Sequence, residues 1–533
     1  MPANDPPLQP NQPQFAGVAP TLQWSTGAAL AYGGLGLVAA AAGGWFPARQ
    51  AQRLPLAASL KGLGGGSHAR HRPAWSLALL AAGGVLALLP PVGGIPVAAY
   101  VSVALLLVGG ITALPAAVAW AYDALAPRLS HRLLPLLAIE RARRVRETAA
   151  VAVSGVVASL ALAVALTVMV ASFRDSVARW LDVVLPADLY VRTADGAAAG
   201  ETAFLDPAFI DAATRVEGVA RSATQRVRAL TLDPARPSAA LIARPLDDPP
   251  QQLPLVGAPL PVPQGRIGLY VSEAVVDLYG VQPGEGFPRL AQALGLGPGG
   301  GATAGASAAG ADAFFIAGIW RDYARQSGAV MIDRADHQRL SGDARVNDLL
   351  LWLQPGADPK AVQARLRALP QVAQAGAPLL EFATTQDIRA VSLRIFDRSF
   401  AVTYWLQAVA IAIGLFGVAA SFSAQVLARR KEFGLLQHLG LTRRQVLAVV
   451  AGEGAAWTAI GSAAGLALGI AVSVVLVHVV NPQSFHWTMD LMLPWLRLAA
   501  LCVAVVAAGT LTAWLAGRAA AGRDMVLAVK EDW

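Results

Sequence analysis

The sequence predicts a polytopic α-helical membrane protein of about seven transmembrane helices, with one extracytoplasmic α+β domain on helical stalks. Only 14% of its 533 residues are charged and 55% are hydrophobic, whereas an ordinary soluble domain has about 25% charged residues. Seven apolar stretches approach or exceed the roughly 20 residues that cross a bilayer. A long segment of normal soluble composition separates the fourth stretch from the fifth. This composition excludes a soluble cytosolic enzyme.

The N-terminal residues 1–23 are rich in Pro and Gln and contain no Lys or Arg, so we expect a disordered segment and no signal peptide. The second apolar stretch is short and ends at Pro90 and Pro91, which predicts a tight hairpin with the third. The seven predicted spans are 24–46, 75–91, 96–122, 148–172, 400–428, 446–479 and 494–517.

Charge is distributed unevenly between the apolar and soluble parts of the chain. Residues 187–395 contain 19 Lys and Arg and 21 Asp and Glu, which gives this segment a net charge of −2. The rest of the chain therefore carries a net charge of +10, for a total of +8. The loops 92–95 and 480–493 contain no basic residue. The positive-inside rule then predicts a multi-pass inner (plasma) membrane protein with its N-terminus outside and its C-terminus cytoplasmic. Nucleic acid is not expected as a partner, because no basic patch with interleaved aromatics is visible. The basic loops are 47–74, 123–147, 429–445 and 518–533.

The segment 187–384 is predicted to fold as the α+β domain. Residues 358–369 have helical spacing, with Ala361, Val362, Leu366 and Leu369 on one face. Helical patterning also continues through 173–185 and 385–400, which predicts two stalks. The expected strands include 187–193, 239–243, 314–320 and 349–353.

An internal repeat links the first and last spans. The stretch WFPARQA (45–51) with Leu60-Lys61 aligns without gaps onto WLAGRAA (514–520) with Val529-Lys530. Chance similarity in Ala-rich sequence is the alternative. The repeat predicts that 24–61 is the last helix and tail of an upstream copy of the same module, most of which this chain lacks. Residues 62–132 are expected to form a linker with a two-helix hairpin.

The segment between the fifth and sixth spans is the most informative. It reads ARRKEFGLLQHLGLTRRQVL (428–447) and contains several apolar residues within a basic cytoplasmic stretch. Within it, Gly440 is expected to end one helix and Thr442 to cap the next. One interpretation is an interfacial helix that anchors the loop to lipid headgroups. The other is a coupling helix that docks into a cytoplasmic partner.

This segment, followed by EGAAWTAIGSAAGLALGIAVS (453–473), resembles the C-terminal signature of the FtsX-like permease family, the MacB-fold (type VII) ABC transporter subunits. LAIERARRVRETAAVAVSGVVASLALAV (137–164) resembles the family's elbow helix and first span, and LPADLYVR (185–192) resembles the start of its extracytoplasmic domain. The resemblance covers 133–533 as one module, with the elbow helix, fourth span and stalk in 133–186 and the permease domain in 385–533.

The resemblance implies a permease subunit that couples ATP hydrolysis by a separate cytoplasmic ATPase to extrusion or release of a lipid, lipoprotein, peptide or drug. It also implies a second permease module or a homodimer, contact with membrane lipids, and in some members a periplasmic protein. Arg443 and Arg444 would lie at the membrane-proximal end of the coupling helix. The coupling-helix residues carried over by the match are Glu432, Phe433, Gly434, Leu435, Leu436 and Leu439.

Two other functions stay open: a mechanotransmitting subunit that regulates a periplasmic enzyme without transport, and an ATPase-independent scaffold. The chain has no Gly-x-x-x-x-Gly-Lys-Ser/Thr loop, so it is not expected to be the ATPase, or any enzyme, or to bind a cofactor. The histidines have no metal-ligand spacing, and no metal is expected.

Small residues recur at Gly461, Gly465 and Gly469 in the sixth span, which predicts close helix packing, either within the subunit or at a dimer seam. Glu453 in the same span is expected to pair with Arg443 or Arg444 rather than carry protons. Asp322 and Asp333 are expected to be surface carboxylates, and no charged cleft is visible in the α+β domain.

Overall fold

The structure, a computed structural model, describes residues 25–52, 73–129, 146–193, 204–295, 313–373, 380–428 and 440–520. The chain divides into two compact units, residues 1–72 and 73–533. Several expectations lie outside the described residues: the disordered segment 1–23, the tail up to residue 61, the elbow helix that starts at 133, and the coupling-helix residues between 431 and 439.

The described part of the first unit is one helix, α1 (Thr26–Gln52), apolar over Thr26–Trp45. Near its end the Arg49 guanidinium lies 5.4 Å from the centre of the Trp45 ring. At the matching place in α19 (Trp495–Ala520), Arg518 lies 5.5 Å from the Trp514 ring. The two aligned segments thus share one local cation–π geometry, and the predicted repeat stays a prediction.

The long helices of the second unit form a membrane bundle that includes one short hairpin. Counting α1, six helices among the described residues are long and apolar enough to cross a bilayer. The predicted second span is α3, whose 15 residues extend only about 22 Å against about 30 Å of hydrocarbon. It pairs with α4 in the expected hairpin. The bundle helices of this unit are α3 (Pro73–Ala87), α4 (Val97–Leu129), α6 (Arg146–Val184), α15 (Ala401–Ala428), α17 (Arg443–Val475) and α19.

Helix α6 is the centre of this bundle. The most apolar stretch of α6 is 72% buried within the protein, against 18% for the stretch that contains α15. Its Val157, Leu160 and Val164 contribute to the bundle core. Helix α17 begins at a capping box in which Thr442 and Gln445 satisfy each other's backbone N–H. It continues through a π turn, η2 (Leu476–Val480), into α18 (Asn481–Phe485).

The α+β domain is built on one eight-stranded mixed sheet of order β5-β4-β6-β3-β2-β7-β1-β8 among the described residues. The long strand β2 joins its halves, because its first part pairs with β7 and its second part with β3. The four strands expected at 187–193, 239–243, 314–320 and 349–353 are confirmed. The strands are β1 (Leu189–Thr193), β2 (Val219–Leu230), β3 (Ala239–Arg244), β4 (Ile267–Ser272), β5 (Phe314–Trp320), β6 (Ala329–Asp333), β7 (Asp348–Leu353) and β8 (Leu380–Thr384).

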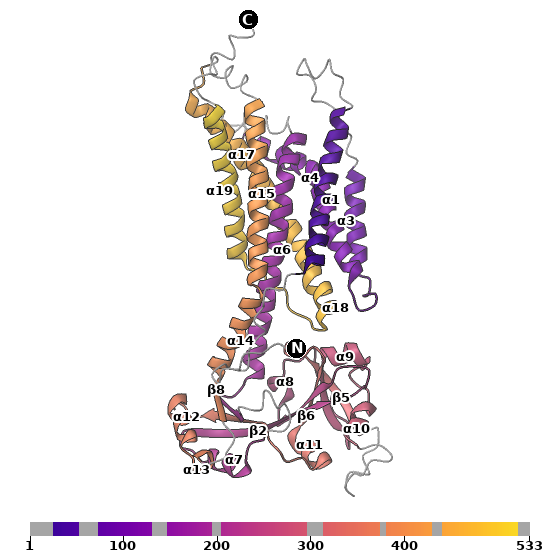
Figure 1. The fold of residues 1–533 in the computed structure, drawn as a ribbon, viewed down its shortest axis with the longest axis vertical. Helices are drawn as coiled ribbons and strands as arrows, with labels where there is room; N and C mark the ends of the chain where they lie inside the picture. Colours follow the sequence, from indigo (N-terminus) through magenta and orange to yellow (C-terminus); the bar gives the residue numbers. More distant parts are fainter. Residues whose placement is uncertain are drawn as a thin grey trace, which may run out of the picture. The chain divides into compact units, whose positions relative to one another are not determined.

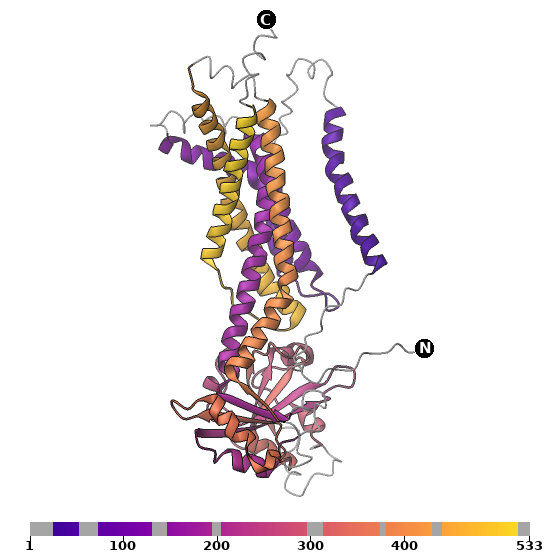
Figure 2. The same cartoon turned by 60° about the vertical axis from the view of Figure 1, so that its left-hand side comes forward.

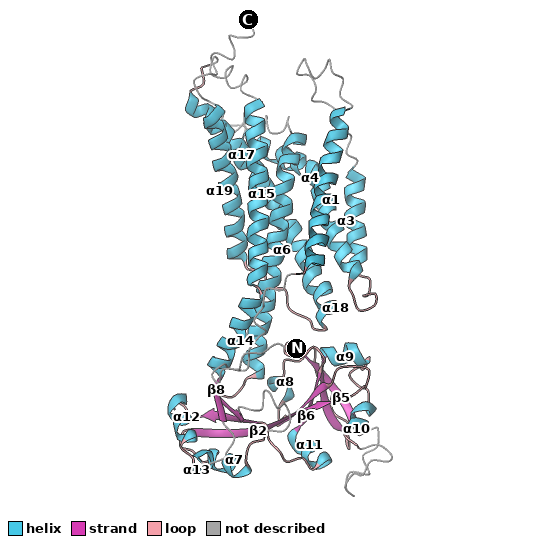
Figure 3. Ribbon diagram, viewed as in Figure 1, coloured by secondary structure: helices cyan, strands magenta, loops and turns pink. Residues whose placement is uncertain are grey.

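Short helices cover the sheet (Figure 3). On one half, Leu189 and Leu349 pack with Phe209 of α7 and Leu366 of α12. The helix expected at 358–369 is α12, which Asp358 caps. Figure 1 shows α7 and α13 on the side of the sheet away from the bundle, and α8 on the side toward it. The helices of this domain are α7 (Pro207–Ala213), α8 (Pro249–Gln252), α9 (Glu273–Tyr279), α10 (Pro288–Ala293), α11 (Arg334–Ser341), α12 (Pro359–Arg367) and α13 (Pro370–Ala373).

Two stalks join the sheet to the bundle, as predicted, and run side by side in Figures 1 and 2. The 39 residues of α6 extend about 58 Å, well beyond one bilayer. The second stalk, α14 (Thr385–Ser399), starts at a Thr384–Asp387 capping box. A single residue, Phe400, separates its end from the start of α15 in the sequence. The stalks enter the sheet at β1 and β8, which are hydrogen-bonded neighbours.

Candidate functional site

The residues predicted for the coupling helix lie only partly within the structure. Glu432, Phe433, Gly434, Leu435, Leu436 and Leu439 are outside the described residues. Arg443 and Arg444 are exposed in the first turn of α17. Arg443 lies near the end of α19, where its Nη2 donates to the Arg518 carbonyl at 3.5 Å. This end of α17 therefore neighbours the C-terminal end of the last span.

The three glycines of α17 face α6. A Cβ placed on Gly461 would lie 2.4 Å from Val153, and one on Gly465 would lie 3.2 Å from Leu160. At Gly469 it would lie 2.7 Å from the Ala161 carbonyl oxygen. This stripe therefore packs inside the chain, as small residues allow. In the same helix Glu453 is buried, with 3% of its surface exposed.

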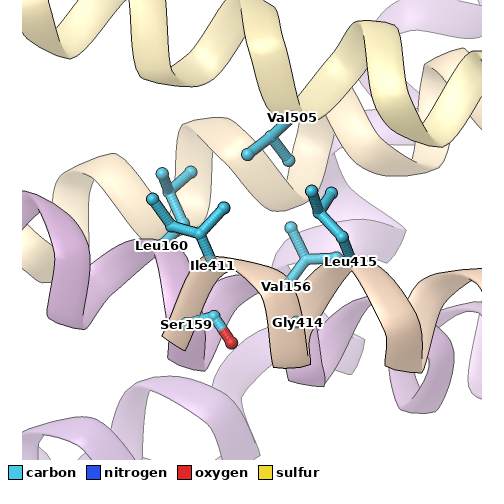
Figure 4. A pocket seen from close by; sticks show the side chains of 7 residues that line it. All are labelled: Val156, Ser159, Leu160, Ile411, Gly414, Leu415 and Val505. Carbon is cyan, nitrogen blue, oxygen red and sulfur yellow. The ribbon is translucent and has the colours of Figure 1, made fainter. Parts of the chain in front are cut away.

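One small gap lies beside α6 in the bundle. An apolar gap of about 10 Å³ lies among α6, α15 and α19 (Figure 4). It is about the size of one water molecule. Gly414 at its edge approaches Ser159 so closely that a Cβ there would lie 2.5 Å from the hydroxyl oxygen. This gap is a packing defect and not a ligand site.

A loop between the last two spans makes several polar contacts with the sheet domain. We call residues 486–494 the docking loop. His486, in the left-handed conformation (φ 61°), ends α18 and turns the chain toward the sheet domain. The Glu273 carboxylate accepts hydrogen bonds from the Thr488 backbone N (3.0 Å) and hydroxyl (2.6 Å). The Tyr323 hydroxyl donates to the Thr488 carbonyl at 2.9 Å, and His486 contacts Asp277. One loop residue thus binds two segments of the sheet domain.

Asp490 ties the same loop to both the domain and a stalk. Its carboxylate accepts two hydrogen bonds from Arg321 at 3.1 Å and pairs with Arg179 of α6 at 3.1 Å. Its backbone N donates to the Ser176 hydroxyl at 3.3 Å. The hydrogen bonds from Arg321 hold the pKa of the Asp490 carboxyl below its ordinary value. Asp490 therefore stays charged at neutral pH.

Aromatic rings fill the space beneath these polar contacts. Phe173 of α6, Tyr323 of the sheet domain and Trp487 of the docking loop are buried together. Their ring centres lie 5.6 to 6.2 Å apart. The Trp180 indole N–H donates to the Arg321 carbonyl at 2.8 Å. Burial raises the pKa of Tyr323 to about 12, so its hydroxyl stays protonated and can donate. The stalk, the docking loop and the sheet domain therefore share one apolar core.

Burial also raises the pKa of Glu273, against the hydrogen bonds from Thr488. Most donors and acceptors of the site bind other protein groups, whereas the Arg321 Nε and the Trp487 indole nitrogen are buried without a partner among the described residues. This arrangement fits a mechanical connection. Among the described residues, no three His, Cys, Asp or Glu side chains come together to hold a metal ion.

Sequence reasoning missed the docking loop, which stood out only as a loop without basic residues. A signal was present: the stretch FHWTMD (485–490) combines aromatics with one acid. The expectation for Asp322 was wrong. It is 2% exposed, because its carboxylate caps the Ala324 N–H and pairs with Arg325. Asp333 caps α11.

These features define a polytopic α-helical membrane protein with an α+β domain on two stalks and a loop that ties the domain to the bundle. Residues 406–525 match the FtsX-like permease C-terminal domain. The chain therefore carries an FtsX-like permease domain, and the docking loop lies within it.

One curated relative supports this assignment. Over 213 residues, 39% of this chain, the sequence is 32% identical to an uncharacterized ABC transporter permease protein of Mycobacterium tuberculosis. The chain spans 24% of the length of that relative.

Two solved structures are similar in part. The periplasmic region of MacB from Actinobacillus actinomycetemcomitans aligns at 10% identity and a TM-score of 0.27, over 40% of this chain and 95% of that one. The extracellular domain of the transporter YknZ from Gram-positive bacteria aligns at 11% identity and a TM-score of 0.23, over 37% of this chain and 98% of that one.

Proposed function

We propose that this chain is the permease subunit of an ABC transporter of the FtsX/MacB type. A separate cytoplasmic ATPase hydrolyses ATP, and the chain transmits the resulting movement to the sheet domain, where a lipid, lipoprotein, peptide or drug is released or extruded. The chain itself catalyses no reaction in this proposal. A second permease module or a second copy of the chain completes the membrane part.

The observation that carries the proposal is the three-way junction at the docking loop. A movement of α17 or α19 reaches the sheet domain directly through Thr488 and Asp490, and reaches the stalk α6 through Arg179. The FtsX-like domain match and the permease relative supply the class of partner. Stalks that only held the domain above a bilayer would need no such second attachment.

The proposed orientation places the sheet domain outside the cell and the ends of α17 and α19 that carry Arg443 and Arg518 in the cytoplasm. With Cys502, the single native cysteine, replaced by Ser, we expect Arg266→Cys to react with an impermeant maleimide added to intact cells. Arg444→Cys should react only after permeabilisation. The reverse pattern contradicts this orientation.

The coupling residues provide the test of function. In vesicles with the partner ATPase, we expect Glu432→Ala with Leu436→Ala to leave the protein in the membrane and to abolish stimulation of ATP hydrolysis. Gln437→Ala, in the same segment but outside the predicted contact set, serves as the matched control. Unchanged stimulation in the double variant contradicts the coupling assignment. Stimulation without movement of any substrate favours the mechanotransmitting alternative.

A further inference from the structure

The sheet domain contains a cavity on the face of the sheet opposite α7 and α12. Its volume is about 230 Å³, which is smaller than the 300 to 1,000 Å³ typical of drug-sized sites. Arg221 and Ala223 of β2 pair with Trp352 and Leu350 of β7, which places these four side chains on one face. Pro186, beside the end of α6, and Gln252 of α8 complete the wall. A headgroup-sized ligand would fit here.

Arg244 is a buried cation beside this cavity. Only 5% of its surface is exposed, and its guanidinium donates one hydrogen bond, from Nη2 to the Gln252 carbonyl at 2.7 Å. Within the part of the chain that the structure describes, no carboxylate pairs with it, and burial lowers its pKa. A buried charge without a counter-charge is costly. An anion in the cavity would remove that cost.

A second guanidinium approaches the same cavity from β2. Arg221 stacks on the Trp352 ring, with its central carbon 4.2 Å from the ring centre. Among the described residues it too forms no ion pair. Stacking on an indole holds a guanidinium in place while leaving its edge N–H groups free to donate. The cavity therefore presents two cations from neighbouring strands.

One neutral group also lacks a partner. The Gln252 side-chain oxygen is buried without a hydrogen-bond donor among the described residues. Rotation of this amide exchanges its oxygen and its NH₂ group, so an anion in the cavity would gain a further donor. Trp352, Leu350 and Pro186 line the remaining wall with apolar surface.

We propose that this cavity binds a phosphate group, free or carried as a phosphate ester on a glycerol-like headgroup. One bidentate arginine satisfies a carboxylate, whereas two guanidinium groups on separate strands match the several oxygens of a phosphate. The apolar wall suits the carbon skeleton of an ester. This binding requires no ATPase and is independent of the proposed transport function.

The test is titration calorimetry on the full chain in an uncharged maltoside detergent at low salt. The ligands are inorganic phosphate, glycerol 3-phosphate, dibutanoyl phosphatidylglycerol and butanoate. We expect saturable 1:1 binding of at least one phosphate compound. Arg221→Gln should weaken it about threefold or more and Arg244→Gln about tenfold or more. Arg266→Gln, an exposed arginine of the same domain, should leave it unchanged.

The ligand series separates the sources. Tightest binding of phosphatidylglycerol assigns a lipid headgroup, and equal binding of glycerol 3-phosphate and inorganic phosphate assigns a free anion. Butanoate that binds as tightly as the phosphates overturns the proposal, as does the absence of saturable binding. If Arg244→Gln lowers the thermal stability, its weaker binding does not count as support, and the variants of the exposed Arg221 test the proposal instead. If both Arg221→Gln and Arg221→Glu bind the phosphate compounds as tightly as the wild type does, the proposal is overturned.

Discussion

Asp343 and His337 show how buried polar residues shape the sheet domain. The Asp343 carboxylate accepts from Arg226 Nε at 3.0 Å and from Arg345 Nε at 2.7 Å, and these bonds hold its pKa well below the ordinary range despite burial. Arg226 is 3% exposed, so this pair is buried as fully as the surrounding core. From sequence, Arg226 and Asp343 look like surface charges, because the two residues of this buried pair lie 117 positions apart.

His337 makes stability depend on pH. Both its ring nitrogens are buried without a hydrogen bond among the described residues, and burial together with nearby Arg334 lowers its pKa to about 4. The unfolded chain takes up this proton near pH 6.5, whereas the folded one does so only near pH 4. The free energy of unfolding therefore falls as the pH drops below about 6.5, by up to about 1.4 kcal/mol per pH unit.

We expect His337→Leu to flatten the change of thermal unfolding temperature between pH 7 and pH 5. His478→Leu, in η2, serves as a control histidine outside the sheet domain. An equal pH slope in wild type and His337→Leu would contradict this role.

At the scale of elements, α17 packs against the backbone of α6 at Gly469, where a Cβ would lie 2.7 Å from the Ala161 carbonyl oxygen. We expect Gly469→Val to lower stability by about 1–3 kcal/mol, because its side chain would meet the Ala161 carbonyl oxygen and Val164 with no room to move. Thermal unfolding in detergent measures this. Gly417→Val in α15 is the matched control, since nothing lies within 4 Å of a Cβ there. An equal loss of stability in Gly469→Val and Gly417→Val would show that helix propensity, and not packing against α6, determines the effect.

The regular elements were predictable because their signals are local. Apolar length identified the spans, continued 3.6-residue spacing identified the stalks, and Thr442 marked the start of α17. Strand β2 was not anticipated, since its 12 residues include Arg221, Arg226 and Arg228 and few β-branched residues. The π turn at Leu476–Val480 has no residue signature, because it depends on the register of the helix with its neighbours.

At the scale of the whole molecule, the domain is held at the stalks and at the docking loop. We expect Arg321→Gln and Asp490→Asn each to increase hydrogen–deuterium exchange of the backbone amides in 486–494. The double variant should add little to Asp490→Asn alone, because both substitutions remove the Arg321–Asp490 contact and Asp490→Asn also removes the ion pair with Arg179. Arg339→Gln breaks an ion pair within α11 and should leave exchange in this loop unchanged. Additive effects of the two junction substitutions would contradict a shared contact.

The candidate site was harder to predict than the fold because it is assembled from three distant segments. Glu273, Arg321 and Asp490 are each ordinary charged residues in sequence, and only the fold brings them together. The arginines of the cavity were hidden for a related reason. Arg221 and Arg244 lie 23 positions apart on neighbouring strands of the sheet, so the expectation of no charged cleft was wrong.

The adjacency of β1 and β8 limits how the stalks can move. Five residue pairs hold the two strands in register, and the Thr385 N–H continues the ladder to the Asp188 carbonyl at 3.1 Å. Sliding one stalk past the other by a single residue would break every rung and invert the side chains. Relative shear between the stalks is therefore blocked at the sheet, whereas a joint tilt breaks no rung. A joint tilt of the stalks would turn the sheet domain about the edge formed by β1 and β8, and the docking loop, attached elsewhere, would restrain it.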